Sequence, residues 1–246
     1  MRSALGIGSA LVVAVATLTW APSASASDGT FTVGVGVMGG GGVVGLGKPA
    51  DNSVGANTVD TSYPGFFGAS YGGGLMVDAR IIRIIGLEID LLRTSDFGNG
   101  DYTLGGNPFV IKIGQSAWQL PVLLKAVLPF GVFRPFVGFG PTFVFPGDAT
   151  ATVTSQGSAT LQTKVEASAS SYTLLTGVLG GEVHLPIPGV DLRIPISLRY
   201  GYNTGTSDKV TDRRDATTSG NTITGVKYKS EWQHHGSANV GVAIYF

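Results

Sequence analysis

The sequence predicts an all-β protein, an eight-stranded antiparallel up-and-down transmembrane β-barrel preceded by a cleavable signal peptide. Three observations predict it. Apolar and other residues alternate along eight segments, the connections between the segments are alternately long and short, and the last segment ends on an aromatic residue. The composition agrees, because 38 glycines and only 13% charged residues suit many strands and turns, while the apolar fraction is too high for a disordered chain.

The N-terminal residues have the pattern of an export signal. Arg2 precedes an uncharged, mostly apolar run from Leu5 to Trp20, and Ala24-Ser25-Ala26 supplies the small residues of a cleavage site. The apolar run is shorter than the roughly 20 residues that a membrane-spanning helix needs. We therefore expect a signal peptide at residues 1–26, an outer-membrane barrel domain at residues 27–246, and export to the bacterial outer membrane.

The eight predicted strands show period-two alternation, since strand side chains point alternately to the two sides of a sheet. Their ranges are 30–38, 67–81, 85–92, 116–127, 133–145, 172–184, 192–202 and 238–246. For the six strands other than 133–145 and 172–184, the clearest outward residues are, in chain order, Val33, Val35 and Val37; Leu75 and Val77; Leu87, Ile89 and Leu91; Leu120, Val122 and Leu124; Leu192, Ile194, Ile196 and Leu198; and Val240 and Val242. The strands at 133–145 and 172–184 are less regular, because both of their faces are apolar or glycine-rich.

The connections between these strands predict the orientation of the barrel. The short ones are 82–84, 129–132 and 186–189, and the long ones, rich in Gly, Ser, Thr, Asn and Asp, are 39–66, 93–115, 146–171 and 203–236. Short periplasmic turns and long extracellular loops are typical of outer-membrane barrels. The even strand number then places both termini in the periplasm, and we expect the glycine run 39–42 to be a flexible loop.

Outward aromatic residues near the strand ends predict two interfacial girdles. Phe31 and Phe133 belong to the periplasmic side, and the extracellular side has Trp118, Phe143, Tyr200 and Tyr202. On the terminal strand Val240, Val242, Ile244 and Phe246 share the outward face. This ending resembles the C-terminal signal by which outer-membrane β-barrels are recognised for assembly, which implies the barrel assembly machinery as a partner.

The charges within the strands share the opposite, inward parity. They are the acids Asp78, Glu88, Asp90 and Glu182 and the bases Arg80, Lys125, Arg134, Arg193 and Arg199. The interior of an eight-stranded barrel is only wide enough for side chains, and buried charges there must pair. We therefore predict a salt-bridge plug that closes the lumen, in which Arg199 reaches Glu88 or Asp90. A gated ion path through the plug is the alternative.

Two segments carry a family resemblance. Residues 119–125 (QLPVLLK) followed by 133–141 (FRPFVGFGP) resemble a hairpin common in small outer-membrane barrels, as does Leu198-Arg199-Tyr200. Together with Phe246, this likeness covers nearly all of the mature chain and resembles the OmpA/OmpX-like family. The resemblance implies the fold rather than an activity, because such barrels serve as anchors, adhesins, pores and enzymes.

One segment suggests chemistry. His235 and Ser237 share a strand face, as a base and a nucleophile would. The segment faintly resembles the His-x-Ser-Asn motif of outer-membrane lipid A deacylases. It departs from that motif because Ala238 precedes Asn239 and no acid follows Ser237. A lipid-modifying hydrolase is therefore the second alternative.

The leading prediction is a non-enzymatic outer-membrane barrel with a plugged lumen, which presents four polar extracellular loops as an anchor or a surface for interactions. A narrow or gated pore for small solutes is the first alternative. We expect no cofactor and no metal. The expected partners are outer-membrane lipid and lipopolysaccharide, together with a ligand for the loops. Nucleic acid is not expected, because 16 basic residues balance 16 acidic ones and no basic stripe appears.

Overall fold

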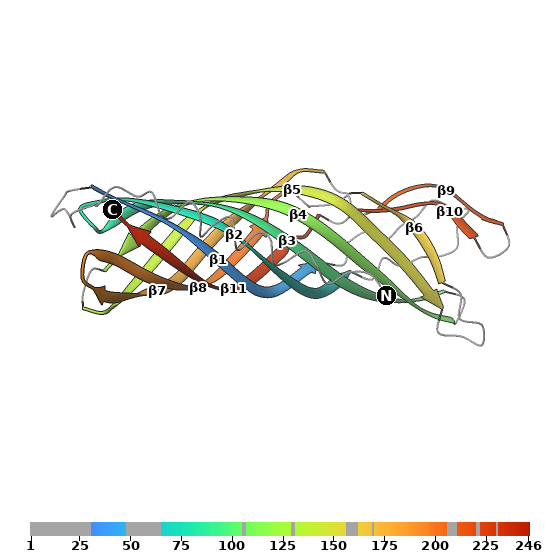
Figure 1. Cartoon of the computed structure of the whole chain (residues 1–246). Helices are drawn as coiled ribbons and strands as arrows, with labels where there is room; N and C mark the ends of the chain where they lie inside the picture. The colour runs from blue at the N-terminus through green and yellow to red at the C-terminus, as the bar shows by residue number, and fades with distance from the viewer. Residues whose placement is uncertain are drawn as a thin grey trace.

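The fold is seen in a computed structural model of the chain (Figure 1). The structure describes residues 31–47, 65–104, 107–128, 131–155, 162–168, 170–205, 211–219, 222–229 and 231–246. The expected signal peptide, residues 1–26, lies outside these ranges. Among the residues described, no helix is long and apolar enough to cross a membrane.

Within the described ranges, eight strands close into an antiparallel barrel. They are β1 (Phe31–Leu46), β2 (Phe66–Ile81), β3 (Ile85–Leu104), β4 (Asn107–Val127), β5 (Phe133–Ser155), β7 (Tyr172–Ile187), β8 (Val190–Asn203) and β11 (His234–Tyr245). Each of these eight strands pairs with the next of the eight along the chain. The last strand, β11, pairs with the first, β1, along residues Tyr245 to His234 of β11. This last pairing closes the barrel, so neither β1 nor β11 is left as a free edge.

The two ends of the barrel differ. The tight connections β2–β3, β4–β5 and β7–β8 lie at one end, which we call the turn end. Phe31 and Phe246 lie there too, where the backbones of Val33 and Phe246 exchange two hydrogen bonds of 2.9 and 3.2 Å. At the opposite loop end, β3, β4 and β5 extend beyond the other barrel strands, and the strands cross the view obliquely between the two ends (Figure 1).

The extension of the strands at the loop end corrects the prediction for residues 93–115. That segment was expected to be a long loop, but β3 and β4 stay paired up to Leu104 and Asn107. The segment lacks the continuous apolar face that marks a strand in lipid. Backbone pairing does not need that face once a hairpin leaves the apolar layer.

Three short strands add to the loop end, in segments that were also predicted as loops. They are β6 (Gln162–Ser168), β9 (Thr211–Ser219) and β10 (Thr222–Lys229). β6 pairs with the end of β5, β10 pairs in parallel with β6, and β9 and β10 form a hairpin. The part of β5 that pairs with β6, Ala151 to Thr154, lies beyond the predicted end of that strand. The loop end therefore carries more sheet than the sequence predicted.

The prediction of a flexible loop at the glycine run 39–42 is also wrong, because these residues lie inside β1 and pair with both neighbours. A Cβ atom on Gly40 would collide with the carbonyl oxygen of Ala238 and approach the Cα of Asn239 at 2.9 Å. The glycine thus allows β1 and β11 to come close together. A local excess of glycine marked close strand packing here rather than a loop.

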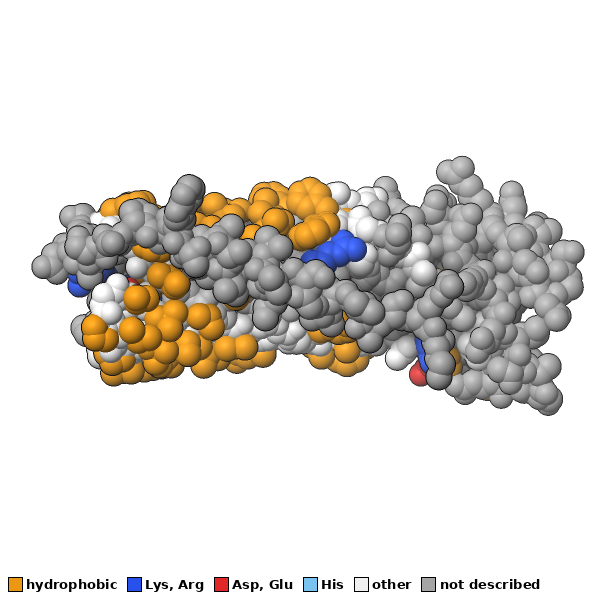
Figure 2. Space-filling model, viewed as in Figure 1, with side chains coloured by type: hydrophobic (Ala, Val, Ile, Leu, Met, Phe, Trp, Pro, Cys, Tyr) orange, Lys and Arg blue, Asp and Glu red, His pale blue; other side chains and the backbone are white. Residues whose placement is uncertain are grey.

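The side chains divide into two faces with the expected parity. Large apolar residues point outward from all eight barrel strands and are 39–63% exposed. We call this set the apolar belt. Its members are Val35, Val37, Leu75, Val77, Leu87, Ile89, Leu91, Leu124, Val137, Phe139, Leu175, Leu179, Ile196, Leu198, Val240 and Val242. Apolar side chains gather on the half of the molecule nearer the turn end (Figure 2). Eight charged residues of the predicted lumen set point inward and are buried: Asp78, Arg80, Glu88, Asp90, Lys125, Glu182, Arg193 and Arg199.

Candidate functional site: the lumen of the barrel

The lumen is filled by three successive layers of side chains. A charged network lies nearest the turn end, a small polar cavity follows, and an apolar cluster lies toward the loop end. Each layer draws on strands from several sides of the barrel, because every second residue of each strand points inward. Together these layers are the candidate site.

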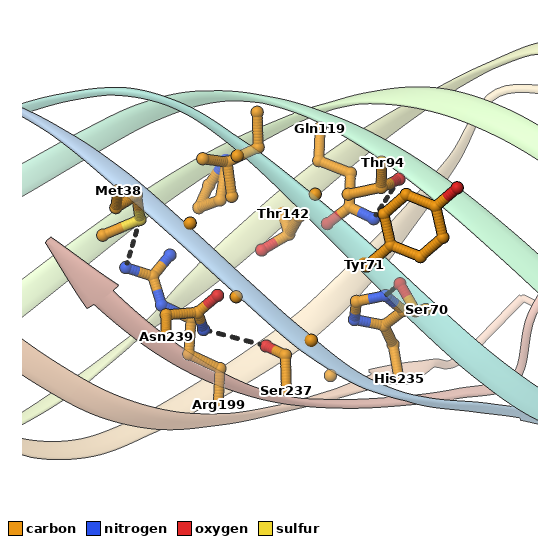
Figure 3. A pocket seen from close by; sticks show the side chains of 18 of the residues that line it. Met38, Ser70, Tyr71, Thr94, Gln119, Thr142, Arg199, His235, Ser237 and Asn239 are labelled. Atoms are coloured by element: carbon orange, nitrogen blue, oxygen red, sulfur yellow. Dashed lines mark hydrogen bonds between the residues drawn. The ribbon is translucent and has the colours of Figure 1, made fainter. Parts of the chain in front are cut away.

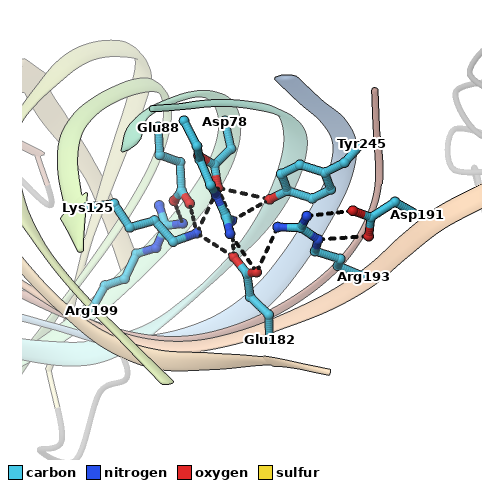
Figure 4. A network of polar contacts seen from close by, with 9 residues as sticks. Asp78, Glu88, Lys125, Glu182, Asp191, Arg193, Arg199 and Tyr245 are labelled. Atoms are coloured by element: carbon cyan, nitrogen blue, oxygen red, sulfur yellow. Dashed lines mark hydrogen bonds and ion pairs between the residues drawn. The ribbon is translucent and has the colours of Figure 1, made fainter. Parts of the chain in front are cut away.

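The centre of the charged network is Arg80. Its guanidinium pairs with the carboxylates of Asp78 and Glu182, and its Nη2 donates a 2.6 Å hydrogen bond to the hydroxyl of Tyr245. That hydroxyl donates in turn to Asp78 Oδ2 over 2.9 Å. Figure 4 shows Asp78, Glu182 and Tyr245 approaching one another from different strands. Arg80 is 1% exposed, and both carboxylates are fully buried.

Lys125 and Arg199 extend the network across the lumen. Lys125 Nζ lies 2.7 Å from Glu88 Oε2 and 3.1 Å from both Asp78 and Glu182. Arg199 on β8 contacts Glu88 at 2.9 Å and Asp90 at 2.5 Å, and both carboxylates come from β3. The network therefore links β8 to β3, a strand with which β8 does not pair.

Arg193 joins the network, while Arg134 lies apart from it. Arg193 binds both oxygens of Asp191, at 2.9 and 2.6 Å, and lies 3.5 Å from Glu182. Arg134 instead contacts the ring of His184, with 3.4 Å between Nη2 and Nδ1. The structure thus brings eight of the nine proposed network residues together and places the ninth at the turn end.

The sequence reasoning missed Tyr245 and Asp191 as members of this network. Tyr245 has the inward parity of β11, opposite to Phe246, and the Arg193 guanidinium lies 3.7 Å from the centre of its ring. Asp191 lies two residues before Arg193 on the same strand face. Parity could have identified both residues. Tyr245 carries no charge, however, and Asp191 precedes the predicted start of its strand at residue 192.

The carboxylates of the lumen network are all in contact with basic side chains. Asp78, Glu88, Asp90 and Glu182 each contact at least one Lys or Arg, and all are 0–2% exposed. A buried charge in such contact gains Coulombic attraction that offsets its lost hydration, whereas an unpaired one would be strongly unfavourable. Chemically, the arrangement is suited to closing the lumen and linking its walls.

The second layer is a cavity of about 40 Å³, room for a few water molecules. Its lining combines glycines and apolar residues such as Met38 and Leu92 with polar side chains, and Figure 3 shows side chains pointing into it from several strands. Gln119 Nε2 donates to Thr94 Oγ1 over 3.1 Å, and the hydroxyls of Thr142 and Thr176 lie 2.8 Å apart. Arg199 lines its wall and so connects the cavity to the charged network.

His235 and Ser237, the residues weighed for hydrolysis, both line this cavity. Ser237 Oγ accepts a 3.0 Å hydrogen bond from the amide of Asn239, and among the contacts described none joins it to His235. His235 Nε2 lies 3.2 Å from Ser70 Oγ, which donates to Asp96 Oδ1 over 2.6 Å. Asp96 therefore binds the serine and not the far nitrogen of the imidazole, unlike the acid of a nucleophile–base–acid relay.

The third layer is an apolar cluster that the sequence reasoning missed. Its members are Val44, Leu46, Phe66, Ile111, Ile113, Ala151, Val153 and Trp232. Trp232 is fully buried, and Ile111 pairs with Val153 across the β4–β5 ladder. The alternation of Ile111 and Ile113 with the exposed Lys112 was a readable strand signal within the predicted loop.

The proposed girdle and assembly residues lie on the outward face. Phe31 and Phe133 are exposed at the turn end, whereas the loop-end set, Trp118, Phe143, Tyr200 and Tyr202, is exposed nearer the other end. Val240 and Val242 point outward on β11, as does the less exposed Ile244, and Phe246 follows that strand with 37% exposure. Their roles remain predictions. In the part of the chain that is described, no group of three or more His, Cys, Asp or Glu could hold a metal ion.

No family model and no curated protein matches the sequence. Solved structures with a similar chain trace include Neisserial surface protein A, which matches with 12% identity and a TM-score of 0.38. That match covers 89% of this chain and 98% of the other. Outer membrane protein OprG from Pseudomonas aeruginosa matches with 12% identity and a TM-score of 0.40, over 88% and 95% of the two chains. Ail, the attachment invasion locus protein of Yersinia pestis, matches with 10% identity and a TM-score of 0.31, over 88% and 97%. At such scores, the assignment of the barrel rests on the strand pairing of this chain.

Proposed function

We propose that this chain is a non-enzymatic, integral β-barrel of the bacterial outer membrane, which anchors itself in lipid and presents its loop end outside the cell. One observation carries the proposal. The barrel is closed, its outward face carries the apolar belt, and eight charged residues of its strands are buried in the lumen. In water this distribution would be unfavourable at every belt residue, whereas in a bilayer the same residues contact acyl chains.

The height of the apolar belt supports a membrane-spanning role. On β5 the outward aromatics Phe133 and Phe143 are separated by about ten residues, which at roughly 3.3 Å per residue and a tilt of about 40° gives a height of roughly 25 Å. This is about the thickness of the apolar band on outer-membrane barrels. Phe133 and Phe143 would then lie near the two interfaces as members of the proposed girdles.

The difference between the two ends supports the orientation. The tight connections of the turn end suit the periplasmic side, and the extended hairpins of the loop end suit the extracellular side. In this orientation the partners are outer-membrane lipid, with lipopolysaccharide around the loop end, and the barrel assembly machinery during insertion. A ligand for the loop end remains a proposal without an identified binding residue.

The filled lumen favours an anchor over a pore. The charged network and the apolar cluster both cross the interior, and the cavity between them holds only a few water molecules. This cavity is the one observation that favours the competing function of a gated pore, since its polar lining could hydrate an ion. Hydrolysis is less favoured, because Ser237 faces the lumen cavity and its described side-chain hydrogen bond is with Asn239 rather than with His235.

The placement of the belt in lipid is testable with single-cysteine variants, since the chain contains no native cysteine. Leu198→Cys places a fluorophore on the belt, and Lys112→Cys places one on the outward face of the loop-end extension. In vesicles of the full chain, we expect a nitroxide on the lipid acyl chain to quench the label at position 198 strongly and the label at position 112 weakly. Equal quenching at the two positions would contradict the proposal.

A further inference from the structure

A groove lies on the outward surface of the barrel, across β5, β7 and β8, and its volume is about 590 Å³. Its floor includes Gly177, which pairs with Phe139 of β5 on one side and with Tyr200 of β8 on the other. Phe139 and Tyr200 are exposed on the outward face, and Gly177 has the outward parity of β7. The groove is therefore the gap that a missing side chain leaves between two exposed aromatic rings.

The walls of the groove are apolar. Leu175 and Leu179 lie two residues to either side of Gly177 on the same face of β7, and Leu198 lies on the outward face of β8. All three leucines are exposed members of the apolar belt. Arg199 is the charged residue in the lining, but its guanidinium points into the lumen, where it contacts two carboxylates of β3. The surface that the groove presents is therefore uncharged.

Polar groups gather where the groove approaches the loop end. Tyr200 and Tyr202 are successive outward residues of β8, and the centre of the His234 ring lies 6.1 and 5.3 Å from the centres of their rings. The hydroxyl of Tyr200 lies 2.7 Å from Nδ1 of His234. Tyrosine rings favour the membrane interface, where one end is apolar and the other meets headgroups and water. The groove thus runs from the apolar belt to a polar rim, formed by Tyr200, Tyr202 and His234.

We propose that the groove holds one acyl chain of a membrane lipid, whose headgroup lies at the polar rim. Lipid tails are as apolar as the belt, so a preference for one part of the belt must come from packing. A chain on the floor of the groove contacts side chains of three strands, and many small dispersion contacts add up to a preference for that position. The uncharged walls match the chain, and the polar rim matches the headgroup. The inference rests on the proposed function, which places the belt in lipid, and adds a fixed position for one lipid.

The test determines whether a lipid stays bound to the barrel. The full-length protein is folded in nonionic micelles that contain phosphatidylethanolamine, and mass spectrometry of the intact complexes gives the ratio of lipid to protein. We expect the wild-type protein to retain a lipid. In Gly177→Leu the affinity for that lipid should fall by roughly tenfold or more, because the leucine side chain fills the gap between the rings. A Cβ atom on Gly177 would have no atom within 4 Å, so the substitution fits the backbone.

Gly39→Leu is the matched control, since Gly39 is an outward glycine of β1 outside the groove, where a Cβ atom would meet only the carbonyl oxygen of Gly72 at 3.5 Å. This variant should retain lipid like the wild type. If Gly177→Leu does not fold, Gly177→Ala fills less of the gap and should lose part of the bound lipid.

The remaining outcomes separate this inference from the proposed function. Wild-type protein without a retained lipid contradicts the inference, as does undiminished retention in both Gly177 variants. A wild-type dimer that Gly177→Leu abolishes would assign the groove to a second copy of the chain and so contradict it too. If the label at Leu198→Cys is strongly quenched in vesicles while no lipid is retained, the fixed lipid site alone is wrong. Weak quenching of that label would overturn the proposed function and this inference with it.

Discussion

Lumen residues differ in how strongly the stability of the barrel depends on them. Arg199 is 8% exposed and is the base that contacts Asp90, which is fully buried. It also contacts Glu88, which Lys125 shares. Loss of Arg199 would therefore leave Asp90 as a buried carboxylate whose contacting base is gone, and removal of one partner from a buried ion pair is strongly destabilising.

We expect Arg199→Gln to lower the free energy of unfolding by about 3–5 kcal/mol. Urea titration of the protein folded in lipid vesicles measures the change. The double variant Arg199→Gln/Asp90→Asn should recover much of the loss, because it removes the unpaired charge. Arg93→Gln serves as the exposed control and should change the stability by about 1 kcal/mol or less. A loss at position 199 no larger than the loss at position 93 would contradict the network.

At this scale the sequence predicted the charged residues well and their contacts only in part. Parity alone placed Arg199, Glu88 and Asp90 inside, and these three do meet. Arg134 has the same parity, yet it lies near the end of β5, beside a cavity of about 270 Å³ at the turn end. The position of a residue along the barrel axis depends on strand tilt and register, which alternation does not determine.

The outward side chains of a barrel strand lie in two chemically different regions, one at the height of the apolar belt and one beyond it. β8 alternates between exposed residues such as Ile196 and buried ones such as Ser197, within the belt. On β3, by contrast, the exposed Asn99 lies on the loop-end extension, where the outward residues are polar as well as apolar. The outward face of the barrel therefore changes character with height.

We expect this change to be measurable with one substitution at two heights. Ile196→Arg should lower the free energy of unfolding from vesicles by about 2–4 kcal/mol, because the charge would face acyl chains near the middle of the membrane. Asn99→Arg adds the same side chain to an outward position beyond the belt and should cost about 0–1 kcal/mol. Similar values at both positions would mean that the belt does not face lipid.

The glycines of β1 provide a second test at the level of the strand. Gly40 faces the backbone of β11, whereas a Cβ atom on the adjacent Gly39 would meet only the carbonyl oxygen of Gly72, at an ordinary 3.5 Å. We expect Gly40→Ala to destabilise the barrel by about 1–3 kcal/mol through forced backbone shifts. Gly39→Ala should be neutral or stabilising by about 0.5–1 kcal/mol. The same urea titration measures both variants, and the reverse order would show that β1 and β11 are not closely packed.

The strands themselves were predictable only where lipid contact imposes a pattern on the sequence. The segment 85–92 alternates cleanly because one face meets lipid and the other lumen charges, and it lies within β3. Beyond Leu92 the same strand continues with outward residues such as Arg93 and Asn99, which carry no common signal. On β4, which pairs with this part of β3, the apolar residues Ile111 and Ile113 recur, but they point inward to the cluster around Trp232.

The whole molecule is a closed barrel with an apolar belt outside, and inside it a charged network and an apolar cluster lie on either side of a small cavity. The ends of the lumen are closed by different means, a charged network toward the turn end and an apolar cluster toward the loop end. Either layer alone would hinder ion passage, because a paired network offers no free counter-charge and an apolar cluster excludes water. Both layers therefore support the proposed anchoring role over that of a pore.

The electrical conductance of the inserted protein tests this account most directly. The full chain is reconstituted in a planar lipid bilayer, and its insertion is verified by acyl-chain quenching of the label at Leu198→Cys. We expect no steady single-channel current from the inserted barrel, because an eight-stranded barrel leaves no aqueous bore and its lumen is occupied by side chains. A stable, porin-sized conductance from the inserted protein would contradict both the filled lumen and the anchoring role.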